Sequence, residues 1–242
     1  MADLHLTPDI TIKEIPMLMQ TDMVIATLNG SKSETRRLTG LEEYNKTPGK
    51  FWIVKRESET GWQVFKSTLS TQWIFWDNLK CPYGKPGDII WVREGFSVWP
   101  EKVTRFKTES LCDPDGWKQT MREKGIKWKP SIHMPKSIAR IWLMVEDIRM
   151  ERIQDITEEG AKAEGAEFET WKGIYKTTHS YMNGFLSIWF SIHNDKMWNS
   201  NPLVWVIKFR VLSTNGRPSN EVILKSHDSI LTTQKGKEAT NA

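Results

Sequence analysis

The segment "NGSKSETRRLTG", residues 29–40, places an amine, a hydroxyl and two guanidinium groups close together, at Lys32, Thr35, Arg36 and Arg37. A threonine hydroxyl is a weak nucleophile until a neighbouring group removes its proton, and an amine with a lowered pKa can do so. Arg37 is planar and permanently charged, and it can hold a carbonyl oxygen, a base edge or a phosphate. The segment is therefore either a solvated turn after a helix or a set of reactive groups held against a substrate.

Four further candidates lie in "WVREGF" and "SIHMP": Trp91, Arg93, Glu94 and His133. Glu94, with Arg93 beside it, can bind a ligand amine at the end of a buried strand, but we favour a salt bridge between strands. His133 can reach a binding site from the end of a long loop, or it is simply exposed. Trp91 offers a flat face for a base, although most of the 13 tryptophans are expected in the core.

Composition narrows the class of protein. The chain has 242 residues, with 34 Lys and Arg against 30 Asp and Glu, a mild basic bias that is compatible with nucleic-acid contact. The two cysteines, Cys81 and Cys112, lack zinc-site spacing, so we expect a reducing compartment, no metal and no cofactor. Neither a secretion signal nor a run of 18 apolar residues is present. These features predict a cytoplasmic protein without a membrane partner.

Local patterns predict the elements that position the candidate residues. A helix over 23–29, capped by Thr21 or Asp22, delivers the first segment, which then continues as an extended stretch with Thr35 and Arg37 on one face. Thr157 is a predicted N-cap with two acidic residues behind it. The other predicted elements are buried or β-rich strands over 89–94, 137–153 and 202–212, and a buried helix over 181–194.

Other regions are less regular. Residues 41–78 contain the strand-like stretches "KFWIVKR" and "GWQVFK", which predict a hairpin. Residues 100–130 predict a long surface loop with a short helix, basic towards its end in "REKGIKWKP". Residues 213–242 are mostly polar and predict a flexible tail that folding does not need.

Four stretches in this order resemble the ASCH family of the PUA-like superfamily, in particular its phage- and prophage-borne members. They are G-x-K-x-x-T-x-R (residues 30–37), "KPGDIIWV" (85–92), "ITEEGAKAEG" (156–165) and "VWVIKF" (204–209). The resemblance implies an α+β fold with a small, curved β-barrel and flanking helices.

The resemblance also implies a division of the chain. Residues 15–212 are the expected ASCH domain, 1–14 an N-terminal extension and 213–242 the tail. Two segments, 38–81 and 96–133, are long insertions relative to the smallest members of the family. Insertions beside a barrel opening determine what can enter it.

The smallest bacterial ASCH proteins are amidohydrolases that remove the acyl group from N4-acetylcytidine with a lysine, a threonine and a glutamate. Matched motif to motif, these residues correspond to Lys32 as base, Thr35 as nucleophile and Glu164 as acid. Arg36, Arg37, Trp91, Arg93, Glu94 and His133 are then candidate binding residues for the substrate or for nucleic acid.

Two alternatives remain open. In one, the chain is a non-catalytic module that binds a modified base or RNA, including single-stranded RNA, with Lys32 and Arg37 on phosphates. In the other, it is a ribonuclease in which the same cations stabilise a cleaving phosphodiester. The enzyme hypothesis requires that Lys32, Thr35 and Glu164 meet, although Glu164 lies far downstream.

Overall fold

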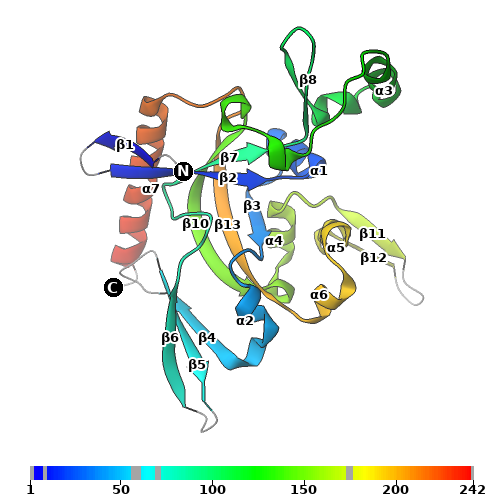
Figure 1. Ribbon diagram of the computed structural model, residues 1–242. Helices are drawn as coiled ribbons and strands as arrows, with labels where there is room; N and C mark the ends of the chain where they lie inside the picture. The colour runs from blue at the N-terminus through cyan, green and yellow to red at the C-terminus, as the bar shows by residue number, and fades with distance from the viewer. Residues whose placement is uncertain (1–2, 8–9, 56–60, 69–71, 173–176, 241–242) are drawn as a thin grey trace. The chain divides into compact units, whose positions relative to one another are not determined.

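The computed structural model contains both helices and strands and describes residues 3–7, 10–55, 61–68, 72–172 and 177–240 (Figure 1). The structure is of the predicted α+β class. By their contacts the residues form two units. Unit 1 comprises Met1–Ser31, Gly87–Met144 and Phe209–Ala242, and unit 2 comprises Lys32–Pro86 and Val145–Lys208.

Unit 1 contains the strand order β1-β2-β7-β10. The apolar run Ile89–Arg93 forms β7, as predicted, and pairs in parallel with residues 14–18 of β2 and antiparallel with the start of β10. Strand β2 begins at Ile10, inside the predicted extension 1–14. The elements of unit 1 are β1 (Asp3–Thr7), β2 (Ile10–Leu18), α1 (Thr21–Leu28), β7 (Ile89–Arg93), β8 (Phe96–Val98), β9 (Thr104–Phe106), η2 (Lys107–Leu111), α3 (Pro114–Glu123), η3 (Ser131–His133), η4 (Lys136–Ile138), α7 (Asn220–Thr240) and parts of β10 (Trp142–Arg152) and β13 (Leu203–Ser213).

The C-terminal residues differ from the prediction. The prediction of a flexible tail is wrong for residues 220–240, which form helix α7. Ile223 and Ile230 of this helix are buried in a core cluster with Ile12, Ile89 and Met144. The helix is therefore part of the core of unit 1 and not an appendage.

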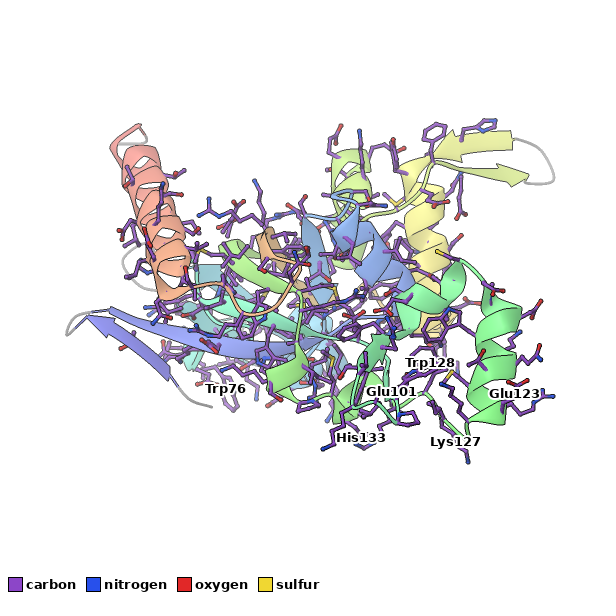
Figure 2. The ribbon with its side chains drawn as sticks, turned by 90° about the horizontal axis from the view of Figure 1, so that it is seen from above. Trp76, Glu101, Glu123, Lys127, Trp128 and His133 are labelled. Atoms are coloured by element: carbon purple, nitrogen blue, oxygen red, sulfur yellow. The ribbon has the colours of Figure 1, made fainter. Side chains whose placement is uncertain are left out.

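The stretch 100–130 contains the predicted short helix, α3, and also strand β9, which forms a hairpin with β8 just before the stretch. Asp113 caps α3 by accepting from Gly116 N at 3.0 Å. The rings of Trp117 and Trp128 stack with centroids 5.9 Å apart, and Trp99 meets Trp117 edge-on at 5.5 Å. Three tryptophans thus hold this segment together; Trp128 is labelled in Figure 2.

Unit 2 contains the strand order β10-β13-β3, with β3 antiparallel to β13. The apolar faces of α4 and α5 meet in a core cluster that includes Ala161, Phe185 and Trp189. The elements of unit 2 are β3 (Glu34–Arg37), α2 (Glu42–Lys46), η1 (Pro48–Lys50), β4 (Phe51–Lys55), β5 (Trp62–Ser67), β6 (Trp73–Leu79), η5 (Ile153–Asp155), α4 (Glu158–Ala163), β11 (Glu169–Lys172), β12 (Thr177–Ser180), α5 (Tyr181–Ile192), α6 (Asp195–Asn199) and the rest of β10 and β13.

A separate three-stranded sheet of unit 2 has the order β4-β5-β6. The predicted hairpin is confirmed as β4 and β5, which pair antiparallel, and β6 adds a third strand that the sequence patterns did not predict. Across the helices that the structure describes, none has the length and apolarity needed to cross a membrane.

Candidate functional site

Lys32 and Glu164, 132 positions apart, are in direct contact in unit 2. Lys32 lies just before β3 and forms an isolated antiparallel bridge with Glu164, which follows the last turn of α4. The Lys32 Nζ donates to the backbone oxygens of Glu34 and Glu164, at 2.8 Å each, and to Glu164 Oε2. Since both residues are almost fully buried, the ammonium and the carboxylate are an enclosed pair.

Helix α4 ends so that Glu164 reaches this position. Thr157 caps the helix, as predicted, by accepting from Gly160 N at 3.1 Å. Gly165 follows Glu164 with φ +83, the left-handed conformation that ends helices and favours glycine. A Cβ at Gly160 would lie 2.8 Å from Arg36 Nη2, so glycine also lets an arginine lie against the helix.

A network of charges continues from the pair. Arg36 donates to Glu151 at 2.8 Å and lies 3.4 Å from Glu164 Oε1, and its guanidinium is 5.8 Å from the ring centroid of Phe185. Both carboxylate oxygens of Glu34 accept from Arg149, at 2.8 Å each. These six residues carry three positive and three negative charges, so the network is balanced; they are Lys32, Glu34, Arg36, Arg149, Glu151 and Glu164.

Burial and the charge of Glu164 act on the pKa of Lys32 in opposite directions. Burial lowers the pKa of Lys32 below its ordinary value, the charge and hydrogen bond of Glu164 oppose this shift, and Arg37 and Arg36 add to it. The pKa of Lys32 is therefore lowered even though its amine has an acid partner.

Thr35 and Arg37 follow on β3, opposite Ile207 and Trp205 of β13. Thr35 is buried, and the Glu34 carbonyl that accepts from Lys32 directly precedes it in the chain. The Lys32 amine therefore contacts the carbonyl of the residue before Thr35, and none of its three hydrogen bonds goes to the Thr35 side chain. Arg37 is half-buried and donates to the carbonyl of Arg36 at 3.4 Å.

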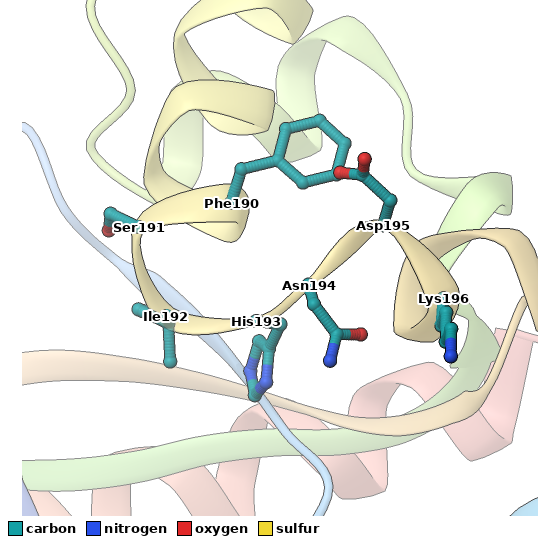
Figure 3. Close-up of a pocket in the computed structure, with 7 residues that line it drawn as sticks. All are labelled: Phe190, Ser191, Ile192, His193, Asn194, Asp195 and Lys196. Carbon is teal, nitrogen blue, oxygen red and sulfur yellow. The ribbon is translucent and has the colours of Figure 1, made fainter.

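His193 belongs to this neighbourhood and was not predicted from the sequence. Burial lowers its pKa, and the charge of Arg37 lowers it further. The ring centroids of His193 and Trp189 are 4.3 Å apart. His193 lines an open hollow of about 680 Å³ between α5 and α6, together with Phe190 and Lys196. Figure 3 shows these side chains. The only sequence signal was a histidine directly after a buried helix.

The other candidates belong to unit 1. Glu94 is buried and receives two hydrogen bonds from Arg140, at 2.9 and 2.8 Å, which is the favoured salt bridge. Trp91 is a core side chain packed with Phe96 and Trp142. Arg93 donates to the carbonyl of Ile132 and lies 5.5 Å from the centroid of Trp91.

His133 is exposed at the end of η3 (Figure 2). Within the described residues, no group of three or more His, Cys, Asp or Glu side chains is arranged to hold a metal ion. Burial raises the pKa of the Cys81 thiol to about 12, which makes it a poor nucleophile.

Comparison of the chain with protein-family models, with curated proteins and with solved structures gives no match. The function must therefore be argued from the site.

Proposed function

We propose that unit 2 carries the catalytic site of an ASCH-type amidohydrolase that acts on an N4-acylated cytidine or a similar modified nucleoside. The PUA-like barrel is part of this proposal. The observation that supports it is the buried contact of Lys32 with Glu164, next to Thr35 on the same strand segment. The hydrolase also requires that the Thr35 hydroxyl reach this pair, and that approach is part of the proposal.

The pair can supply a base and an acid together. Transfer of one proton from the Lys32 ammonium to Glu164 Oε2 leaves a neutral amine and a carboxylic acid. Burial disfavours separated charges and lowers the pKa of Lys32, and both effects favour this neutral form.

The reaction balances in two steps. The Thr35 hydroxyl attacks the acyl carbon as its proton moves to Lys32, the bond from the acyl carbon to N4 breaks, and Glu164 protonates the departing amine. Cytidine leaves, and the acyl group remains as an ester of Thr35. Water then attacks the ester as one of its protons moves to the Glu164 carboxylate, and Lys32 returns its proton to the Thr35 oxygen as the ester bond breaks. A carboxylic acid is released, and the hydroxyl, the neutral amine and the protonated Glu164 are restored.

A second candidate is a module that binds a modified base or RNA without catalysis. It is favoured by the hydrogen bonds of Lys32, because the amine donates to three acceptors and none of them is Thr35. In this function the Lys32–Glu164 pair fixes the start of β3, and Arg37 beside His193 contacts the ligand. A ribonuclease would use the same cations, and it has less support than the binding module.

The test is hydrolysis of N4-acetylcytidine, followed by chromatography of cytidine. Thr35→Ala should reduce hydrolysis to the rate in buffer, and Thr35→Ser should keep part of it because a hydroxyl remains. Thr39→Ala is the matched control, since Thr39 is an exposed threonine of the same segment. Full activity of Thr35→Ala, or an inactive wild type with acylated cytidines, contradicts the amidohydrolase and favours the binding module.

A further inference from the structure

Strand β6 exposes four consecutive large apolar side chains. Trp73, Ile74, Phe75 and Trp76 are between 44% and 52% exposed. Such residues are normal on a surface when they are scattered, but a contiguous group marks a binding surface. Strand β6 is at the edge of its three-stranded sheet.

The pairing of β5 with β6 places some of these rings on one face. Phe65 lies opposite Phe75, and Ser67 lies opposite Trp73. The same register pairs Gln63 with Asn78, so amides flank the rings on this face. Trp62, Val64 and Leu79 point to the opposite face and are buried. The outward surface, called the stacking face below, consists of Gln63, Phe65, Ser67, Trp73, Phe75 and Asn78.

The chemistry of the stacking face suits unpaired bases. Alternate residues on a strand are about 7 Å apart, and aromatic side chains on a sheet can each stack one base of a single strand. Phe65 and Phe75 meet edge-on, with centroids 6.1 Å apart. The amides of Gln63 and Asn78 can donate to and accept from base edges.

The charge of the surrounding segment suits a polyanion. Residues 50–80 contain five basic and three acidic residues. Lys66 Nζ lies 3.8 Å from the ring centroid of Trp76, which is labelled in Figure 2. Asp77, the acid on β6, accepts a hydrogen bond from Tyr44 at 3.4 Å.

Two other occupants fit less well. A second copy paired along the edge of β6 is disfavoured by the irregular register between Val64 and Phe65, because a β-bulge twists an edge away from regular pairing. A lipid surface would bury the amides of Gln63 and Asn78 without partners, which is unfavourable. A nucleic acid satisfies both the rings and the amides.

We propose that the stacking face of β5 and β6 binds single-stranded nucleic acid, through bases stacked on Trp73 and Phe75. This site is separate from the Lys32–Glu164 pair and does not depend on the proposed hydrolysis. It gives the sheet of residues 51–79 a function of its own.

The test measures the binding of fluorescein-labelled 12-nucleotide oligo(U), oligo(A) and oligo(dT) by anisotropy. Trp73→Ala and Phe75→Ala should each weaken binding about 5- to 150-fold, whereas Trp73→Phe should retain most of it. Phe168→Ala is the matched control, because Phe168 is 59% exposed elsewhere in unit 2.

All these variants should hydrolyse free N4-acetylcytidine as the wild type does, so each proposal can fail without the other. Ultraviolet cross-linking of the wild type to oligo(U) should label the peptide containing residues 73–76, which requires no variant to fold. The proposal is overturned if no oligonucleotide binds or if Trp73→Ala binds as the wild type does. It is equally overturned if the substitutions abolish only self-association or only binding to anionic vesicles.

Discussion

Each unit buries a glutamate against a cation, but the cations differ. In unit 1 Glu94 accepts two hydrogen bonds from Arg140, whose guanidinium also donates to Thr108. In unit 2 Glu164 faces Lys32, whose pKa burial lowers. An arginine holds its proton at any ordinary pH, so its pair can only bind and orient. A buried lysine can release a proton, so its pair can take part in chemistry.

The largest expected effect comes from exchanging the cations. Lys32→Arg retains the charge but removes a group able to give up its proton, so hydrolysis of N4-acetylcytidine should fall about 10²- to 10⁴-fold. The reciprocal variant, Arg140→Lys, should leave turnover unchanged. Steady-state kinetics of both variants check this, and undiminished hydrolysis by Lys32→Arg would remove the general-base role.

A large effect on stability is expected when the two acids are removed. Glu164→Ala leaves the Lys32 amine buried without its counter-charge and should reduce the free energy of unfolding by about 3–5 kcal/mol. Glu94→Ala should lose about 1.5–3 kcal/mol, because Arg140 is partly exposed and remains 3.8 Å from Glu109. Urea unfolding followed by circular dichroism measures both.

The pH dependence of the stability lost in Glu164→Ala and in Glu94→Ala should distinguish the buried lysine from the arginine. The lowered pKa of Lys32 means that the unfolded chain holds the lysine proton to a higher pH than the folded chain, so this residue's contribution to stability rises as pH increases towards 10.5. Without Glu164 the pKa falls further, and the loss in Glu164→Ala should shrink with rising pH. The loss in Glu94→Ala should not, because arginine does not titrate there. Equal pH profiles for the two variants would contradict this difference.

Local sequence patterns predicted the elements around the site well. The cap at Thr157, the strand β7 and the closing strand β13 follow from short-range capping and apolar runs, and each is confirmed. The contact of Lys32 with Glu164 was not predictable in this way, because no local pattern joins residues 132 positions apart. Only the order of motifs in the ASCH resemblance brought these two residues together.

Other features were missed for physical reasons. In residues 220–233, where the burial of α7 is described, the buried side chains are Ile223, His227 and Ile230, a sparse repeat in a polar segment. Strand β6 exposes its apolar side chains and lacks the alternation of a half-buried strand. Arg36, not Arg37, is the buried arginine of the ionic network. The sequence could not show this, because alternation along β3 tells which side chains share a face but not which face is buried.

Deletion of α7 should lower the stability by less, and only in unit 1, which contains the Glu94–Arg140 pair. A chain ending at Ser219 loses the burial of Ile223 and Ile230, offset by the chain entropy that the helix no longer loses. A net loss of about 2 kcal/mol corresponds to a thermal midpoint lower by about 4–8 °C. Calorimetry of the shortened chain measures the shift, and an unchanged midpoint would show that α7 contributes nothing to the core. Hydrolysis at 20 °C should persist.

The smallest expected effect concerns Glu34, another of the three acids in the network around Lys32. Burial raises the pKa of Glu34, but the hydrogen bonds and charge of Arg149, together with Arg36 and Lys208, outweigh this and lower the pKa below its ordinary value of 4.5. Because the folded pKa is lowered, Glu34 stabilises the folded chain above about pH 4.5, and this contribution is lost as pH falls through the folded pKa.

Glu34→Gln should therefore cost about 1 kcal/mol at pH 7 and have progressively less effect below pH 4.5. Glu42→Gln is the matched control, because Glu42 is an exposed glutamate at the start of α2. Urea midpoints of both variants and the wild type between pH 3 and 7 measure the difference. If Glu34→Gln loses the same stability at pH 3 as at pH 7, the charge of Arg149 does not stabilise the Glu34 carboxylate. The network around Lys32 is then held by packing alone.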